Sequence, residues 1–190
     1  MLEELVQWDR DVFLFLNGLG SSTWDGFWLF ITGKWSSIPL YAILLLLSIR
    51  LLGWKATGIL LIAVALLITT TDQLANFFKY GVERLRPCHD EQLFEAMRLV
   101  KRSCGGKFGY FSAHASNSMA LASFFSILLR KKIKWIPLFL LPWAIVVGYS
   151  RIYIGVHFPL DIVTGISIGL LLGWLFFVLK RYAVKKLLKI

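Results

Sequence analysis

Three short segments of the chain carry the side-chain types that transfer of a phosphoryl group requires. They are residues 79–87 (KYGVERLRP), 111–114 (FSAH) and 150–161 (SRIYIGVHFPLD). Their fixed cations and histidines are Lys79, Arg86, Arg151, His114 and His157. Fixed cations stabilise the charge on the outer oxygens of a phosphoryl group as it is transferred, and a histidine can accept that group covalently. The segments therefore predict a phosphate site with a nucleophilic imidazole.

The spacing within the third segment predicts how its histidine is activated. Asp161 follows His157 by four residues, and Pro159 between them is typical of a first helical turn. A carboxylate one turn away can accept the imidazole N–H and leave the other ring nitrogen free to attack phosphorus. The alternative for this pair is a structural cap on the helix that follows. Arg151 can bind phosphate oxygens in a bidentate manner, and its alternative is an ordinary cation at a membrane edge.

The second segment predicts the start of a helix. Ser112 is a good N-cap, which alone could explain it, and the free N–H groups of a first helical turn attract an anion. His114 lies in that turn. A lone histidine near a helix start is usually a surface residue, but this one coincides with two other basic segments, so we expect it to share the anion.

The composition of the chain predicts a polytopic membrane protein. Hydrophobic residues make up 57% of it and charged residues 17%, where soluble proteins have about a quarter charged residues. Five apolar runs approach the ~20 residues that cross a hydrocarbon core. These runs are 38–54, 56–71, 112–129, 135–149 and 162–179. A soluble bundle would show polar stripes along its helices, and these runs lack them, so the fold class predicted is an all-α transmembrane bundle with five spans.

The N-terminal segment, residues 1–34, predicts helices of another kind. Acidic residues lie among apolar ones as far as Leu16, a pattern typical of a helix in the membrane interface, before glycines and serines break it. We expect interfacial or partly inserted helices there, or a sixth span if Asp11 or Asp25 is sheltered by protein. The whole chain is predicted to be one domain, with the bundle over 35–180.

The polar residues that follow the apolar run 56–71 predict how Lys79 and Arg86 reach the site. Five of its residues are spaced to share one helical face, namely Asp72, Asn76, Lys79, Glu83 and Arg86. We expect the helix to continue until Pro87 ends it, with this face turned inward, because charged groups at membrane depth usually mark function. The alternative is a solvated helix end with intrahelical ion pairs, which fits Arg84 and extends to Glu83.

Basic residues gather in alternate connections of the predicted bundle. Eleven of the 21 Lys and Arg residues, and none of the 11 acidic ones, lie in three of them. They are Arg50, Lys55, Arg130, Lys131, Lys132, Lys134, Lys180, Arg181, Lys185, Lys186 and Lys189. Because short basic loops stay in the cytoplasm, we expect a cytoplasmic C-terminus and phosphate segments on the extracytoplasmic face of the plasma (inner) membrane. The net charge of +10 then sets orientation and contact with anionic lipids, not binding of nucleic acid.

The two cysteines, Cys88 and Cys104, lie in one outward connection. Oxidising conditions outside the cytoplasm permit a disulfide, which is worth ~3 kcal/mol for such a loop on the chain-entropy model; two unrelated thiols are the alternative. Their spacing fits no zinc pattern, and no histidine pair has helical ligand spacing. No metal or other cofactor is therefore expected. His89 is expected to be a solvated loop residue.

The order and spacing of the three segments resemble the three-part signature of the type-2 phosphatidic acid phosphatase family. The matching positions are Lys79, Arg86, Pro87, Ser112, His114, Ser150, Arg151, His157 and Asp161. The resemblance implies a bundle of six spans that hydrolyses lipid phosphates without metal, through a phosphohistidine. It implies His157 as nucleophile, Asp161 as its orienting partner and His114 as the acid for the leaving oxygen. The phosphate-binding residues it implies are Lys79, Arg86, Ser112 and Arg151.

One of the three parts departs from that signature, at two positions. Where the family usually has Pro-Ser-Gly-His, Ala113 replaces the glycine and Phe111 the proline. If the glycine needed a positive φ, alanine would be strained by ~1 kcal/mol or more. Because the segment should start a helix, we expect Ala113 to offer its N–H to phosphate without strain.

A membrane lipid phosphatase is the function that these observations predict. The outward site favours undecaprenyl diphosphate as substrate, with phosphatidylglycerol phosphate, phosphatidate and lipid A as alternatives. A transporter of anionic lipids would not need His157 and Asp161 paired, and a scaffold would not need intact reactive residues. The expected partners are the lipid phosphate substrate and membrane lipids, and the sequence leaves the oligomeric state open.

Overall fold

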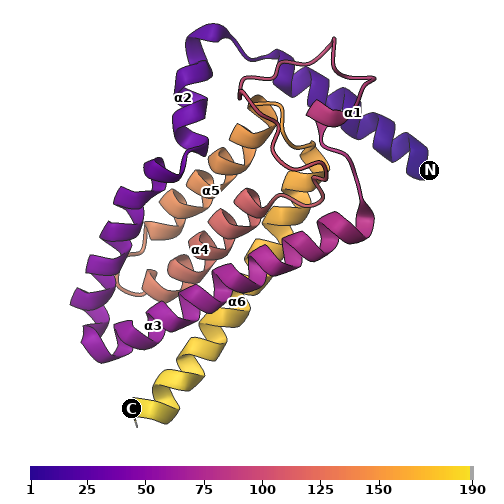
Figure 1. Cartoon of the computed structure of the whole chain (residues 1–190). Helices are drawn as coiled ribbons and strands as arrows, with labels where there is room; N and C mark the ends of the chain where they lie inside the picture. The colour runs from indigo at the N-terminus through magenta and orange to yellow at the C-terminus, as the bar shows by residue number, and fades with distance from the viewer. Residues whose placement is uncertain (189–190) are drawn as a thin grey trace.

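The computed structural model describes residues 1–188, and the elements of this described part are all helical (Figure 1). In chain order they are α1 (Leu2–Gly18), α2 (Ser22–Thr32), the 3-10 turn η1 (Lys34–Ser37), α3 (Ile38–Val82), the 3-10 turn η2 (Pro87–His89), α4 (Ala113–Leu129), α5 (Ile136–Tyr153) and α6 (Pro159–Leu188). Helices α3, α5 and α6 are long and apolar enough to cross a membrane, and α4 is a shorter apolar helix. The predicted all-α membrane bundle is confirmed.

Helix α3 is folded sharply near its middle and supplies two of the predicted spans. Gly53 has φ 77° and ψ 167°, a backbone region open essentially to glycine alone. The helix runs down to this residue and then rises beside α4, as Figure 1 shows in purple and magenta. One helical hairpin therefore replaces the separate runs expected at 38–54 and 56–71, and its second arm extends to Val82.

Helix α4 lies at the centre of the bundle and packs against α3, α5 and α6. Its buried serines return hydrogen bonds to the helix backbone, as Ser118 Oγ does to the carbonyl of His114 at 2.8 Å. Helix α6 approaches it closely because three buried glycines face it. At the middle one, Gly169, an added Cβ would lie 2.5 Å from the carbonyl oxygen of Ser116. Small residues of this kind let helices pack tightly in lipid.

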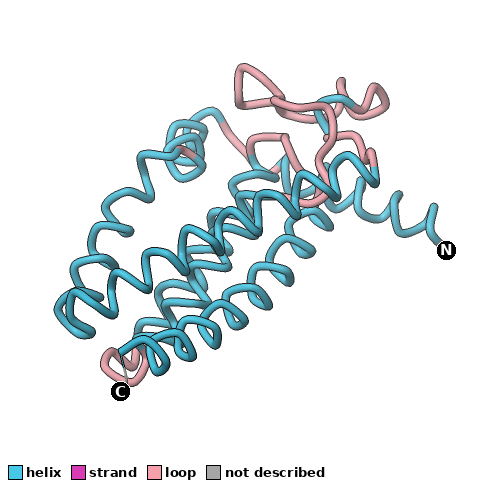
Figure 2. Tube along the Cα trace, turned by 60° about the horizontal axis from the view of Figure 1, so that its bottom comes forward, coloured by secondary structure: helices cyan, strands magenta, loops and turns pink. Residues whose placement is uncertain are grey.

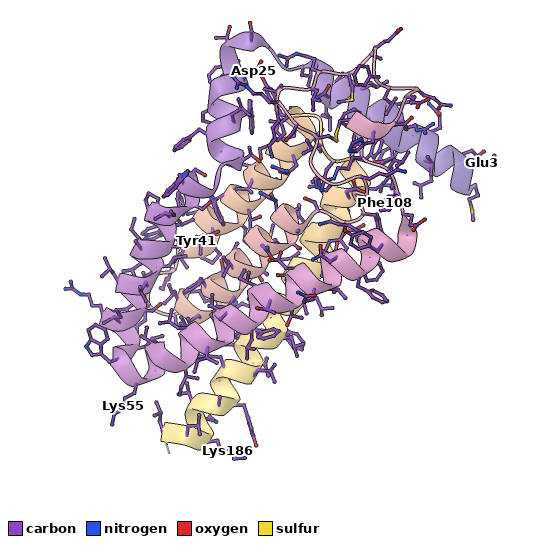
Figure 3. All side chains as sticks on the ribbon, viewed as in Figure 1. Glu3, Asp25, Tyr41, Lys55, Phe108 and Lys186 are labelled. Atoms are coloured by element: carbon purple, nitrogen blue, oxygen red, sulfur yellow. A yellow bond between two sulfur atoms is a disulfide. The ribbon has the colours of Figure 1, made fainter. Side chains whose placement is uncertain are left out.

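The two ends of the bundle differ in charge. Lys55, at the bend of α3, and Lys186, near the end of α6, lie at one end, and Phe108 lies at the other (Figure 3). The connection 130–135 between α4 and α5 is at the Lys55 end as well (Figure 1). The three basic clusters therefore share one end of the molecule, although Lys189 of the third cluster lies outside the described residues.

Helix α1 lies across the other end of the bundle rather than beside its helices (Figures 1 and 2). Phe13 is fully buried, and its ring meets that of Phe158 with centroids 5.3 Å apart. Trp8 and Phe15 are exposed, as an interfacial helix requires. This placement agrees with the interfacial helix expected within residues 1–34. Helix α1 does not run parallel to the bundle as a sixth span would.

The helix that carries Lys79 ends earlier than predicted. Its last residue is Val82, and Glu83 caps it with a left-handed φ of 53°. The expected continuation to Pro87 is therefore wrong. Of the face expected to turn inward, Asn76 and Glu83 are exposed.

Extended backbone replaces the missing helical turn. Residues 84–86 run beside the segment that precedes α4: the N–H of Arg86 donates to the carbonyl of Lys107 at 3.1 Å, and the carbonyl of Arg84 accepts from Gly109 at 2.8 Å. This pairing satisfies backbone groups that a helix would have satisfied internally. It also brings the side chain of Arg86 to the site by a route that helical periodicity does not predict.

Substitution of Gly169 tests the close approach of α4 and α6. Gly169→Val should destabilise the bundle by ~1–3 kcal/mol or prevent folding, because the backbone of α4 leaves no room for the side chain. Gly58→Ala is the matched control, since a Cβ there meets nothing within 4 Å. Thermal unfolding in detergent, followed by circular dichroism, compares the two. Equal unfolding temperatures would contradict the packing described.

Candidate active site

His157 and Asp161 form the pair that their spacing predicts. His157 Nδ1 lies 3.2 Å from Asp161 Oδ2, and the exposed fractions of the two residues are 2% and 0%. His157 stands in the connection before α6, whose first residue is Pro159. With Nδ1–H donating to the carboxylate, Nε2 keeps its lone pair.

The surroundings of His157 keep its ring neutral. Burial lowers the pKa of His157 to about 4; the hydrogen bond and charge of Asp161 act in the opposite direction, and Arg151 and Arg86 lower it further. The lone pair is therefore available near pH 7. It would be lost only as the pH falls toward that value.

Asp161 is held by more than the imidazole. Its Oδ2 also accepts the N–H of Phe158 at 3.0 Å, which is one of the two hydrogen bonds of a capping box at the start of α6. Its backbone carbonyl accepts the N–H of Ser112 at 3.1 Å, so the second and third motifs are joined directly. Helix capping and orientation of His157, which the sequence left as alternatives, coexist in one side chain.

Arg86 is oriented by carbonyl groups of the extended connection. Its Nε donates to the carbonyl of Phe108 at 3.2 Å and its Nη1 to that of Cys104 at 3.1 Å. In the structure Cys104 is joined to Cys88 by a disulfide with Cα atoms 5.9 Å apart. The loop that this bridge closes therefore supplies the acceptors that aim the guanidinium.

Arg151, in the last turn of α5, is 5% exposed, so it is not an ordinary cation at the membrane edge. Its Nη1 donates to Thr32 Oγ1 at 2.5 Å, which ties it to the end of α2. Its Nε is buried and has no hydrogen-bond partner among residues 1–188. A buried N–H without an acceptor is costly, and a phosphate oxygen would satisfy it.

Lys79 and His114 complete the group from the second arm of α3 and the first turn of α4. Lys79 lies within electrostatic reach of Arg86, Arg151 and Asp161, and His114 lies within reach of Arg151 and Lys79. His114 is exposed and lines a cavity of about 200 Å³. All three motifs therefore converge at the end of the bundle that α1 crosses.

Ser112 and Ala113 have the conformations expected of a helix start. Ser112 caps α4, and its Oγ accepts the N–H of Ala115 at 3.4 Å. Within the described chain, Glu83 is the one residue other than glycine with a positive φ. The expected absence of strain at Ala113 is therefore confirmed, and the first turn of α4 can offer its N–H groups to an anion.

Arg84 belongs to the site, contrary to the expectation of a solvated helix end. Its Nη1 donates to Asp161 Oδ1 at 3.1 Å, and its Nη2 donates to Asp9 of α1. The sequence carried a signal for it, because it is a third cation inside the first motif. A helical segment would point Arg84 away from Arg86, so the expected helix does not predict this place for Arg84.

Two further residues reach the site from elements whose position only the fold reveals. Thr32 ends α2 and holds Arg151. Lys101 lies in the disulfide-closed loop, where partial burial and the positive charges of Arg151 and Arg86 lower its pKa. No sequence pattern pointed to either. His89 is exposed, as predicted.

Comparison with known proteins agrees with this arrangement. The profile of the PAP2 superfamily matches residues 54–185, which contain all three motifs. The chain belongs to the PAP2 superfamily. A lipid A 4'-phosphatase of Bacteroides thetaiotaomicron is 40% identical to this PAP2 protein over 93% of the chain and 79% of its own length. One from Porphyromonas gingivalis is 35% identical over 96% of the chain and 77% of its own length.

A solved structure shows the same fold. It is the transmembrane PAP2-type phosphatidylglycerolphosphate phosphatase of Bacillus subtilis, with a TM-score of 0.73 and 23% identity over 94% of this chain and 87% of that one. At this identity the likeness concerns the fold alone. Family membership and the near-complete matches to curated phosphatases make this PAP2 protein a membrane lipid phosphatase.

The Cys88–Cys104 bridge is expected in the native protein and is expected to keep Arg86 aimed. Mass spectrometry of unreduced peptides should find the two cysteines linked. Replacing both by serine should lower the free energy of unfolding by ~3 kcal/mol and raise KM for a lipid phosphate, because the carbonyl of Cys104 loses its fixed place. Two alkylatable thiols in protein isolated without reductant would contradict the bridge.

Proposed function

We propose that this PAP2 protein hydrolyses a lipid phosphate through a phosphohistidine on His157, without a metal ion. The observation that carries the proposal is the buried pair of His157 and Asp161 surrounded by fixed cations. Those cations supply the charge that a metal ion supplies in other phosphatases. Among residues 1–188, no three His, Cys, Asp or Glu side chains are grouped so that they could hold a metal ion.

In the first step, His157 Nε2 attacks phosphorus while the bond from phosphorus to the lipid oxygen breaks. His114 donates a proton to that leaving oxygen. Asp161 accepts the Nδ1–H and stabilises the positive ring. Arg86 and Arg151 hold the outer phosphoryl oxygens, and the unpartnered Nε of Arg151 is free to donate to one of them.

In the second step, water attacks the phosphorus of the phosphohistidine. His114, now neutral, accepts the proton of that water, and the bond between nitrogen and phosphorus breaks. Inorganic phosphate leaves, and His157 returns to its neutral form. Two steps through a covalent intermediate have lower barriers than one direct hydrolysis. The exposure of His114 to a cavity at the end of the bundle supports access of water.

An apolar cavity beside the site supports a lipid substrate. It has a volume of about 530 Å³, lies between the two arms of α3 and is lined almost wholly by apolar side chains. Tyr41, on the first arm of α3 (Figure 3), and Asn117 line both this cavity and the smaller one at His114. An acyl or prenyl chain lying in the first cavity would place its phosphate near the second.

Lipid A is the substrate that we propose first. Two relatives that match almost the whole chain at 35% identity or more carry the name lipid A 4'-phosphatase. Undecaprenyl diphosphate, which the sequence alone favoured, is the second candidate. The observation that supports it is the position of the basic clusters at the end of the bundle opposite the site, because a site that faces outward would meet phosphates exposed on the outer leaflet.

We propose that the site faces away from the cytoplasm in the plasma (inner) membrane, with the C-terminus inside. The basic clusters lie at the end of the bundle opposite the site (Figures 1 and 3). Short basic segments are retained in the cytoplasm. The disulfide in the loop over the site also fits an oxidising compartment.

His157→Ala tests the proposed reaction. With lipid A in detergent micelles and EDTA present, we expect the wild type to release phosphate and His157→Ala to lose at least about a thousandfold of kcat. His89→Ala is the matched control, because His89 is an exposed loop histidine. A protein-bound phosphoryl group from radiolabelled substrate, labile in acid, should be trapped in the wild type and absent from His157→Ala.

Two results would contradict this reaction. The first is near wild-type turnover by folded His157→Ala. The second is activity that EDTA abolishes and magnesium restores. Transport of an anionic lipid by a wild-type protein that releases no phosphate would favour the transporter instead.

Cysteine labelling in intact cells tests the orientation. On a background with Cys88→Ser and Cys104→Ser, Ser103→Cys should react with a membrane-impermeant reagent, because the loop lies at the site end. Lys132→Cys should react only after lysis. The reverse pattern would invert the topology and remove the argument for an outer-leaflet substrate.

A further inference from the structure

The second arginine of the first motif contacts the carboxylate that orients His157. Arg84 Nη1 donates to Asp161 Oδ1 at 3.1 Å, and the other carboxylate oxygen, Oδ2, faces His157 Nδ1 at 3.2 Å. The carboxylate is therefore shared, with one oxygen for the guanidinium and one for the imidazole. Asp161 cannot rotate toward either partner without losing the other.

The other half of the guanidinium is bound to the interfacial helix. Arg84 Nη2 donates to Asp9 Oδ2 at 2.5 Å, and Asp9 Oδ1 accepts the N–H of Leu160 at 2.9 Å. Asp9 and Asp161 both have an exposed fraction of 0%, and the side chain of Arg84 is 18% exposed. Two buried carboxylates therefore share one cation, and removing it would take from both the charged partner to which they are hydrogen-bonded.

Packing against aromatic rings fixes the plane of this guanidinium. Arg84 Cζ lies 4.3 Å from the ring centroid of Phe158, the residue directly after His157. Phe158 in turn meets Phe13 of α1 edge to face, with centroids 5.3 Å apart. Arg84 is thus held by hydrogen bonds at two ends and by a cation–π contact on its face.

We infer that Arg84, held in place by Asp9 of α1, is a positioning residue that fixes Asp161 for His157. The inference rests on the proposed role of His157 as nucleophile. It makes α1 part of the catalytic apparatus, although α1 carries none of the three motifs. A purely structural clamp between α1 and the bundle is the competing explanation.

The position of the charge makes these explanations separable. The charged and titratable groups around His157 come from every element that surrounds it. They are Asp161 of α6, Arg84 and Arg86 of the connection, Lys101 of the disulfide-closed loop, Arg151 of α5, His114 of α4, Lys79 of α3 and Asp9 of α1. Removing the positive charge of Arg84 strengthens the attraction of Asp161 for a protonated imidazole, so the pKa of His157 should rise. A clamp that acts on folding alone, with no coupling between Arg84 and the pair of Asp161 and His157, predicts no such change.

The test compares four full-length variants in detergent micelles with lipid A as substrate. Arg84→Gln should lower kcat by about ten- to a hundredfold, leave KM within about threefold, and move the acid limb of the kcat profile up by about one pH unit. Arg84→Lys should return the acid limb to its wild-type position while recovering only part of kcat, because one ammonium cannot bridge two carboxylates in the geometry of a guanidinium. Asp9→Asn should lower kcat without moving the acid limb upward.

Arg10→Gln is the matched control for loss of an arginine between α1 and the bundle. Arg10 donates to Asp90 at 2.7 Å and to Gln92 at 2.9 Å, so it ties the same helix to the same loop without touching Asp161. Its kcat, KM and acid limb should be those of the wild type. Thermal unfolding of each variant separates loss of folded protein from loss of turnover.

Measuring the pKa of His157 without substrate separates this inference from the proposed function. The chain has three histidines, so nitrogen NMR of labelled histidine, assigned with His89→Ala and His157→Ala, follows the titration of His157 directly. A higher pKa in Arg84→Gln than in the wild type supports the inference; an unchanged pKa and acid limb would overturn it. If Arg84→Gln does not fold, Arg84→Lys decides. A raised acid limb in Arg84→Lys would overturn the inference, and an acid limb at the wild-type position with reduced kcat would support the inference. Failure of the wild type to hydrolyse lipid A, undecaprenyl diphosphate or phosphatidate would instead overturn the proposed function.

Discussion

The burial of opposite charges at one end of an apolar bundle is the constraint on which the rest of the structure depends. An ion moved into low-dielectric surroundings loses several kcal/mol of hydration unless partners replace the water. Asp161 obtains those partners from His157, Arg84 and the N–H of Phe158. The cations on the other side of His157 have fewer partners, and the Nε of Arg151 has none. A phosphate dianion would supply what is missing, so this imbalance of charge is the basis of the proposed phosphate site.

The packing of α4 against α6 sets the distances within that site. Glycines on α6 let its backbone approach the backbone of α4, and the two helices start beside each other. The N–H of Ser112 consequently reaches the carbonyl of Asp161 at 3.1 Å. This hydrogen bond joins the N-cap of α4 directly to the pair of His157 and Asp161. A substitution in the glycine face would therefore disturb catalysis as well as stability.

In the proposed reaction, water and lipid would reach His157 through different cavities. The end of the bundle carries the disulfide-closed loop and α1, and the small cavity at His114 lies there. The apolar cavity between the arms of α3 lies beside it and shares Tyr41 and Asn117 with it. The bend at Gly53 produces the two arms between which that cavity lies, so a glycine at the far end of the helix shapes the space offered to the lipid.

The sequence by itself determined the apolar runs, their orientation signal and the residues of the three motifs, because each of these depends on local composition or on spacing within one helical turn. The pairing of His157 with Asp161 and the cap at Ser112 belong to this class. Only the tertiary structure decided that the helix of Lys79 stops at Val82. The helical spacing of the sequence continues to Arg86. In the structure, however, residues 84–86 are extended and pair with the loop before α4, which satisfies their backbone N–H and C=O groups. The roles of Arg84 and Thr32 were likewise decided by the tertiary structure. Their partners lie 77 and 119 residues away along the chain. A local sequence pattern cannot predict such contacts, because they form only when distant elements pack together.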